Sequence, residues 1–203
     1  TRAPTTPMEL VTHKKLYLVS GRISRPLAES IAAEMGESLG EPNLAEFSNG
    51  EIHCRFSESI RGCDVFIIQT HCHEPGSSIN DALMEQLIMV DAARRASAKR
   101  ITVVCPHYGY ARQDRKSSGR EPITAKLVAN LFKEAGASRL VSVDLHSGQI
   151  QGFFEGPVDH LTAMPVLVDR LRSLEGDLTI VSPDAGRVKV AERYAIQLGA
   201  DLA

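Results

Sequence analysis

The sequence is poor in cysteine and has no long apolar segment. Its 203 residues include only four cysteines, and none of them forms a CxxC pair. Few and scattered cysteines are typical of a reducing compartment rather than of a disulfide scaffold. No apolar run approaches the roughly 20 residues that cross a bilayer, and the amino terminus lacks the apolar core of a signal peptide. We therefore expect a cytoplasmic protein that does not cross a membrane.

A strong excess of one charge is also absent. The chain has 23 Lys and Arg against 25 Asp and Glu, a formal net charge of -2. This balance argues against a nucleic-acid surface, but a local group of cations could still hold a small phosphorylated ligand. The nucleotide-binding signatures GxxxxGK[ST] and GxGxxG after a strand are missing as well. If a nucleotide binds, another arrangement must hold it.

The sequence does contain an alternation of short β-rich runs and longer helical patterns. Such alternation predicts βαβ units and an α/β protein built on a parallel sheet. With 43% hydrophobic residues, the chain can bury a core in one large domain or in one and a half. In the helical pattern over 79–96, the apolar spacing leaves Asp81, Glu85 and Arg94 on the more exposed face. The predicted strands are 16–20, 65–70, 101–105, 139–144 and 178–182, and the predicted helices are 26–39, 79–96, 123–135 and 188–198.

The stretch YARQDRK directly follows a predicted strand and combines three cations with one carboxylate. Arg112, Arg115 and Lys116 can donate to phosphate oxygens. Gln113 and Asp114 can accept hydrogen bonds from a base or a sugar, or hold the arginines in place. The pattern favours a loop that grips a polyphosphate, although a solvated charged loop would have the same composition.

A second polar pattern ends the predicted strand over 139–144. Asp144 and His146 stand two residues apart and would point to the same face of an extended strand. Magnesium prefers oxygen ligands and keeps substrate phosphates in its shell, so Asp144 is the candidate direct ligand and His146 a candidate phosphate contact. The alternative is a strand end whose polar residues satisfy the backbone of a loop.

A third polar loop, SPDAGR, begins at Ser182. Its small residues allow a close backbone approach to a ligand, and Asp184 could meet a metal or hydroxyl groups. A plain helix N-cap is the alternative. Ligands of open parallel sheets bind at the carboxyl ends of the strands, so we expect the loops after Cys105, Asp144 and Ser182 to converge at one edge.

Histidine and cysteine also occur together in the sequence around the predicted strand ends. Their spacing fits no common zinc pattern, and we interpret them as loop residues. His107 or Tyr108, which precede the cationic loop, could face a ligand. The residues concerned are His53, Cys54, His71, Cys72, His73, Cys105 and His107.

Five longer motifs occur in a fixed order along the chain. They are FSNGE at 47–51, YARQDRK at 110–116, REPITAKLVANL at 120–131, DLHSGQIQGFF at 144–154 and SPDAG at 182–186. With these motifs the chain resembles the ribose-phosphate diphosphokinase, or PRPP synthetase, family over residues 15–203. The resemblance implies a phosphoribosyltransferase-like (type I) parallel-sheet fold. We expect a flexible leader over 1–14, a complete N-terminal domain over 15–160 and the start of a second, similar domain over 161–203.

The resemblance also implies an activity. Family members transfer the diphosphoryl group of Mg-ATP to the C1 hydroxyl of ribose 5-phosphate, which gives 5-phosphoribosyl 1-diphosphate and AMP. The implied metal-side residues are Asp144, His146 and Asp184, and Asp184 also lies on the ribose 5-phosphate side. The FSNGE loop is implied to reach the adenine in a neighbouring subunit's site. The residues implied at ATP are Phe47, Asn49, Glu51, Arg112, Gln113, Asp114 and His146.

Assembly and control are implied in the same way. Members of the family usually form homo-oligomers, hexamers built from dimers, and many bind phosphate or ADP at a second, subunit-interface site. Arg61, Arg120, Gln151 and Asp159 fall at the matching regulatory positions. Ordinary polar groups at a surface or an interface remain the alternative for these four residues.

The largest departure from the family is a missing part. The flexible Lys/Arg catalytic loop and the acidic DDxxDTGGT-type loop for ribose 5-phosphate are absent, so no certain catalytic residue lies in this chain. The strand-like start at 201–203 agrees with a truncated chain, which we expect to be inactive or nearly so on its own. Two other functions stay open, a non-catalytic synthetase-associated regulatory subunit and a phosphoribosyltransferase. The intact RQD, DLH and SPD triplets argue against the first, and the missing acidic loop argues against the second.

Overall fold

The computed structural model describes residues 15–203 as two compact units. The first unit runs to His160 and the second from Leu161 to Ala203. The leader expected over 1–14 lies outside the described residues. No described helix is both long enough and apolar enough to span a membrane.

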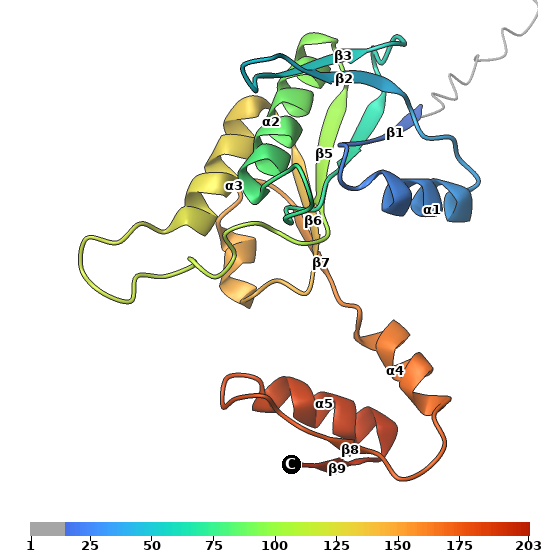
Figure 1. Ribbon diagram of the computed structural model, residues 1–203, viewed down its shortest axis with the longest axis vertical. Helices are drawn as coiled ribbons and strands as arrows, with labels where there is room; N and C mark the ends of the chain where they lie inside the picture. Colours follow the sequence, from blue (N-terminus) through green and yellow to red (C-terminus); the bar gives the residue numbers. More distant parts are fainter. Residues whose placement is uncertain (1–14) are drawn as a thin grey trace, which may run out of the picture. The chain divides into compact units, whose positions relative to one another are not determined.

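A five-stranded sheet forms the centre of the first unit (Figure 1). The strands lie in the order β1-β4-β5-β6-β7, and β1, β4, β5 and β6 run parallel to one another. The predicted parallel α/β fold is therefore confirmed. The strand bounds are β1 Leu16–Ser20, β4 Asp64–Ile68, β5 Arg100–Cys105, β6 Arg139–Val143 and β7 Val158–Leu161.

Helices cover both faces of this sheet. Figure 1 shows α1 (Arg25–Met35) on one side, and α2 (Ile79–Arg95) and α3 (Thr124–Ala135) packed together on the other. The expected extension of the first helix to residue 39 is wrong. The helix ends because Gly36 takes a left-handed conformation, with φ at 66°, which glycine adopts without steric cost.

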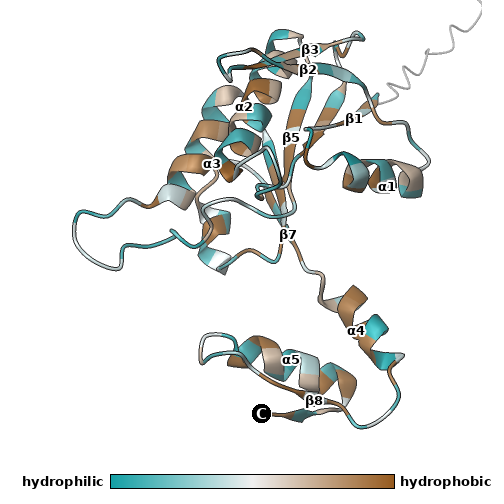
Figure 2. Cartoon of the chain, viewed as in Figure 1, coloured by the Kyte–Doolittle hydropathy of each residue, from teal (hydrophilic) through white to brown (hydrophobic). Residues whose placement is uncertain are grey.

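The core lies between the sheet and these helices. β-Branched residues of the strands, such as Val65 and Val103, are fully buried against Val90 of α2 and Phe132 of α3. Figure 2 shows the corresponding brown faces on the helices. Strands with near-continuous apolar runs are what a parallel sheet covered on both faces requires.

An antiparallel hairpin that we did not predict crosses from α1 to β4. Its strands are β2 (Pro42–Glu46) and β3 (Ile52–Phe56), and β3 lies against α2. Gly50 has a φ of 88° in the turn. The Asn-Gly pair at 49–50 was the available hairpin signal.

Glu85 corrects our expectation for the exposed face of α2. Its side chain is only 2% exposed, whereas Asp81 and Arg94 are exposed as predicted. The carboxylate accepts hydrogen bonds from the Arg22 backbone N–H at 2.7 Å, from Arg22 Nε at 2.5 Å and from Gln69 Nε2 at 2.9 Å. Arg22 also reaches Glu46 of the hairpin at 3.2 Å. Burial of this charge is possible because three donors replace water.

The second unit is smaller and contains α4 (Met164–Arg172), β8 (Thr179–Ile180), α5 (Val188–Leu198) and β9 (Asp201–Leu202). β8 and β9 pair in parallel as a separate two-stranded sheet. The helix predicted over 188–198 and the strand start at 201 are confirmed, and the strand predicted over 178–182 is shorter. Several apolar side chains of this unit are exposed, among them Val166, Val181 and Ile196.

Replacement of Glu85 by alanine tests the buried carboxylate. We expect Glu85→Ala to lower the free energy of unfolding of the first unit by about 2–4 kcal/mol, because the buried amide of Gln69 and the partly exposed Arg22 lose their acceptor. Urea denaturation measures the change. The control Glu134→Ala removes an exposed carboxylate of α3 and should cost at most about 0.5 kcal/mol. Equal losses for both variants would contradict this account.

Candidate functional site

The loop that follows β5 is hydrogen-bonded through its backbone to one buried histidine, His71. Its backbone N–H donates to His107 O at 3.1 Å, and its Nδ1 accepts from the Gly109 N–H at 2.9 Å. Tyr108, between these two contacts, is buried and donates its hydroxyl to Ala125 O at 2.9 Å. Of the two residues that could face a ligand, Tyr108 is thus part of the core, while His107 is exposed.

The carboxylate of Asp114 joins this loop to the loop after β6. It accepts from Ser147 Oγ at 2.5 Å and from Gln149 Nε2 at 3.0 Å, and the residue is only 7% exposed. The hydrogen bond from Ser147, followed by those from Gln149 and by the nearby His146, lowers the pKa of this carboxyl group. Asp114 therefore points into the protein rather than along the loop surface. Sequence reasoning did not assign Ser147 or Gln149 any role.

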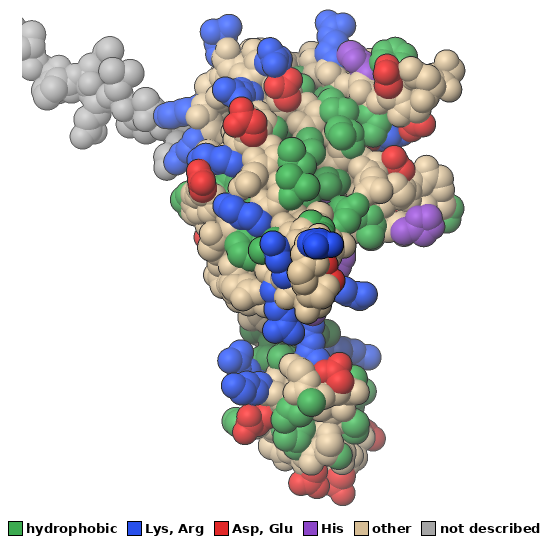
Figure 3. All heavy atoms as spheres, turned by 90° about the vertical axis from the view of Figure 1, so that its left-hand side faces the viewer, with side chains coloured by type: hydrophobic (Ala, Val, Ile, Leu, Met, Phe, Trp, Pro, Cys, Tyr) green, Lys and Arg blue, Asp and Glu red, His purple; other side chains and the backbone are tan. Residues whose placement is uncertain are grey.

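The three cations of the loop are exposed. Within residues 15–203 no ion pair involves Arg112, Arg115 or Lys116, although arginines elsewhere in this range do pair with carboxylates. Figure 3 faces the side where the loop protrudes and shows Lys and Arg side chains gathered there. Positive charge without a carboxylate partner in the described part of the chain suits an anionic ligand.

Gln113 is hydrogen-bonded to residues at the start of α3. Its side-chain oxygen accepts from Thr124 Oγ1 at 2.5 Å, and its backbone O accepts from the Ala125 N–H at 3.2 Å. The nitrogen of the amide group is therefore the atom that remains available as a hydrogen-bond donor. The same contacts join the end of the YARQ segment to the first turn of α3.

Asp144 and His146 lie beyond the strand on which we placed them. β6 ends at Val143, and Asp144 has a positive φ of 46°, so the expected strand alternation does not reach these residues. Aspartate adopts this left-handed conformation more readily than most residues. The Leu145 N–H between them donates to His160 Nε2 at 2.9 Å. Both side chains are exposed at the carboxyl end of β6.

The FSNGE motif forms the tip of the β2–β3 hairpin. The Phe47 N–H donates to Glu51 O at 2.8 Å, and Asn49 Oδ1 accepts from the Glu51 N–H at 3.1 Å. Phe47 is 56% exposed and lies beside His53, with ring centroids 5.9 Å apart. A large aromatic ring exposed on a turn can stack on a flat partner.

The SPDAGR loop belongs to the second unit. It follows β8, which pairs with β9 and not with the five-stranded sheet, so our expectation of three loops on one sheet edge is wrong. Asp184 Oδ1 accepts from the Gly186 N–H at 2.8 Å, and Asp184 O accepts from Ser182 Oγ at 2.8 Å. The loop thus stabilises its own turn, and Asp184 is exposed.

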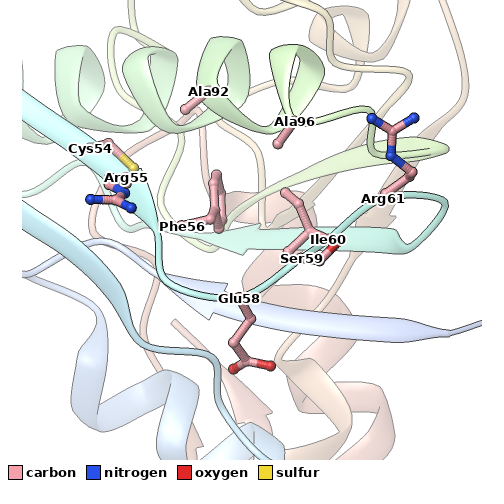
Figure 4. A pocket seen from close by; sticks show the side chains of 9 residues that line it. All are labelled: Cys54, Arg55, Phe56, Glu58, Ser59, Ile60, Arg61, Ala92 and Ala96. Carbon is pink, nitrogen blue, oxygen red and sulfur yellow. The ribbon is translucent and has the colours of Figure 1, made fainter.

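The four regulatory candidates do not meet in one place within the first unit. Arg61 precedes β4, at the amino edge of the sheet, and lines a pocket with Arg55 and Ser59 beneath α2 (Figure 4). Arg120 and Gln151 instead follow β5 and β6 at the carboxyl edge. Asp159 pairs with Arg139 at 2.6 Å. A single site made from all four would need a second chain.

The histidines and cysteines form no metal centre in the described part of the chain. Within residues 15–203 no group of three or more His, Cys, Asp or Glu side chains could hold a metal ion. Burial lowers the pKa of His71 to about 4, with hydrogen bonding to Gln86 acting in the opposite direction. Burial also raises the pKa of the Cys105 thiol. These two groups are neutral core residues.

The fold and the site together define a class of protein. The first unit is a parallel α/β domain with an unneutralised cationic loop at the carboxyl edge of its sheet. A family model for the N-terminal domain of ribose phosphate pyrophosphokinase matches residues 16–136. The chain belongs to the ribose-phosphate pyrophosphokinase family.

Individual relatives agree with this assignment. The chain is 56% identical over 190 residues to a ribose-phosphate pyrophosphokinase of Bifidobacterium longum. This alignment covers 92% of this chain and 55% of the relative. It is 52% identical over 200 residues to the ribose-phosphate pyrophosphokinase of Streptomyces coelicolor, an alignment that covers 98% of this chain and 60% of the relative. A crystal structure of phosphoribosylpyrophosphate synthetase from Mycobacterium smegmatis matches with a TM-score of 0.88 and 52% identity, over 94% of this chain and 63% of that one. The chain spans somewhat more than half the length of the curated relatives it matches.

Asp114→Ala tests the link between the two loops. We expect it to lower the free energy of unfolding of the first unit by about 1–3 kcal/mol at pH 7, because the half-buried Ser147 hydroxyl and the exposed Gln149 amide lose their acceptor, the buried carboxylate. Asp91→Ala, which removes a carboxylate paired with Arg95 on one helix, should cost less than about 1 kcal/mol. Urea denaturation of both variants gives the comparison.

The same variant has a defined pH dependence. Because the folded-state pKa of Asp114 is lowered, its contribution is present above the ordinary aspartate value of about 3.9 and is lost as the pH falls through the folded-state value. The difference in stability between the wild type and Asp114→Ala should therefore shrink below about pH 4. A difference that stays constant down to pH 3 would rule out the ionised carboxylate as its source.

Proposed function

We propose that this chain is the ATP-binding part of a ribose-phosphate diphosphokinase. The observation that carries the proposal is the loop after β5, where Arg112, Arg115 and Lys116 are exposed without a carboxylate partner in the described residues, and the one acid of the loop, Asp114, is turned inward. Such a loop can neutralise a triphosphate. The complete enzyme would transfer the diphosphoryl group of ATP to the C1 hydroxyl of ribose 5-phosphate.

Catalysis in this scheme consists of positioning and charge neutralisation, and it needs no covalent protein nucleophile. Arg112 and its neighbouring cations would bind the phosphate oxygens and offset the charge that develops on the diphosphoryl group. Gln113 would donate from its amide nitrogen, because its oxygen is held by Thr124. Asp114 would act on ATP indirectly, by fixing the loop against the segment after β6.

Magnesium fits the residues at the carboxyl end of β6. Asp144 would supply a carboxylate oxygen and His146 an imidazole, both on an exposed turn of the first unit. Asp184, the other residue proposed for the metal, is an exposed carboxylate of the second unit. Magnesium usually keeps several waters and substrate phosphates in its shell, so one or two protein carboxylates are enough to bind it. When bound, the ion would polarise the phosphate and neutralise its charge.

The hairpin tip would serve the adenine of a neighbouring subunit in a homo-oligomer, as a hexamer built from dimers. Phe47 offers an exposed ring for stacking, and Glu51 offers an acceptor for the adenine amino group. Asn49 would contribute its amide nitrogen, because its oxygen already closes the turn. The exposed position of the tip supports an intermolecular role.

We assign Asp184 to the ribose 5-phosphate side and place the enzyme in the cytoplasm.

The regulatory proposal rests on Arg61, Arg120, Gln151 and Asp159, with phosphate or ADP as the ligand. Because Arg61 lies at the opposite sheet edge from Arg120 and Gln151, such a site would form between subunits. This arrangement agrees with control through the assembled oligomer.

Titration of the chain with Mg-ATP tests the function. We expect saturable binding by isothermal titration calorimetry, and a loss of about tenfold or more in affinity for Arg112→Ala, since hydrogen bonds to charged groups contribute about 1.5–3 kcal/mol. Arg95→Ala removes an exposed arginine that already pairs with Asp91, and should leave the affinity unchanged. Absence of binding by the wild type would refute the proposal.

A second measurement separates the fragment from the complete enzyme. The chain incubated with Mg-ATP and ribose 5-phosphate should form no AMP above the background, because the acceptor loops of the family are missing from this sequence. Robust AMP formation at the mass of the intact chain would show that those loops are not required. Retained ATP binding without transfer is the result that the proposal expects.

A further inference from the structure

His71 is buried beneath the cationic loop and belongs to none of the family motifs in this sequence. It follows β4, on a different segment from the loop that it holds. Its side chain is fully buried, and its ring stacks on Phe132 with centroids 5.9 Å apart and planes 13° from parallel. The packing fixes the plane of the ring and therefore the direction in which both nitrogens point.

The hydrogen bonds of the ring define its tautomer. Nδ1 accepts from the Gly109 N–H at 2.9 Å, so the ring proton is on Nε2, which donates to Gln86 Oε1 at 2.9 Å. Gln86 is fixed in turn, because its Nε2 donates to Ile67 O at 2.9 Å and to Val104 O at 3.3 Å. One continuous chain of hydrogen bonds thus runs from the backbones of β4 and β5 to the start of the loop.

The contact with Gly109 continues directly into the residues proposed to bind ATP. Tyr110, the next residue, has a positive φ of 62°, and its backbone O accepts from the Gln113 N–H at 2.9 Å. Arg112 lies inside this turn. A shift of Gly109 would therefore move the turn and the direction of the Arg112 side chain.

The space around Gly109 shows how closely the two residues meet. A Cβ atom at position 109 would lie 2.9 Å from Cβ and 3.1 Å from Nδ1 of His71. Because a separation of this kind is sterically prohibitive, any side chain at position 109 must displace the ring or the loop. His71 thus binds the backbone of the loop at two points, the carbonyl of His107 and the N–H of Gly109. We call this pair of contacts the clamp.

We propose that His71 is a positioning residue of the ATP site, which sets the turn 110–113 through the Gly109 N–H and so orients Arg112 and Gln113 toward the phosphates. This inference rests on the proposed function. His71 does not contact the ligand and acts only through the loop. The groups that face its ring are Gln86, Tyr108, Phe132 and Gly109, and the nearby titratable groups are His107 and Cys105.

Two substitutions separate the clamp from simple packing. In His71→Asn the amide oxygen takes a position close to that of Nδ1 and can still accept from Gly109, whereas in His71→Gln the amide lies near Nε2 and the Gly109 acceptor is lost. We expect His71→Gln to weaken Mg-ATP binding by about tenfold, the factor that corresponds to about 1.4 kcal/mol. His71→Asn should stay within about threefold of the wild type, a factor that corresponds to about 0.7 kcal/mol.

The readouts are calorimetric titration with Mg-ATP and amide hydrogen exchange of residues 109–113 in the 203-residue chain. His71→Gln should speed exchange at Gly109, and His71→Asn should restore its protection. His73→Gln, a change at an exposed histidine on the same segment, is the matched control and should alter neither readout. Gly109→Ala should reproduce the loss of affinity from the other side of the contact.

The outcomes separate the inference from the proposed function. A wild-type chain that fails to bind Mg-ATP would overturn the proposed function and the positioning role with it, whatever the exchange rates are. A wild type that binds, with His71→Gln and His71→Asn equally impaired, would assign His71 to packing alone. Unchanged affinity in His71→Gln and Gly109→Ala would also overturn the inference.

Discussion

The carboxyl edge of the sheet depends on two adjacent buried polar residues in the second turn of α2. Glu85 accepts from Arg22 and Gln69, and Gln86 bonds the backbones of β4 and β5 and the ring of His71. A buried polar group is costly without hydrogen-bond partners, so these bonds favour one arrangement over others, although Gln69 Oε1 has no partner among the described residues. The loops after β1, β4 and β5 are all positioned by this one helical turn.

In the loops held by that network, some residues bind the loop to the core and others remain exposed to solvent. Asp114, His71 and Tyr108 face inward and hold the loops to the core, while Arg112, Arg115 and Lys116 remain exposed. Side chains that interact with a ligand are more effective when their backbone is fixed in advance, because less freedom is lost on binding. The sequence motif YARQDRK therefore contains two kinds of residue that composition alone does not distinguish.

The alternation of apolar runs was sufficient to predict the parallel sheet, α2, α3 and α5, because these elements bury continuous faces. It did not reveal the β2–β3 hairpin, whose strands are only half buried, or the end of α1, which a single left-handed glycine decides. Glu85 was misplaced because a charged side chain at a core-facing position is visible only when its partners, far apart in sequence, are known. For the site, the motifs pointed to three cations after the third predicted strand, and these are exposed in the loop after β5. The inward turn of Asp114 and the bend at Asp144 depend on tertiary contacts and backbone conformation, which the motifs do not reveal.

The two units of the chain differ in how they are built. The first has a five-stranded sheet covered by helices, whereas the second has two short strands and leaves Val166, Val181 and Ile196 exposed. A two-stranded sheet supplies little stability by itself. The second unit should therefore open in a separate step of lower free energy, as a cooperative unit distinct from the first. Heating the chain is then not a two-state process, and a single melting temperature would describe neither unit.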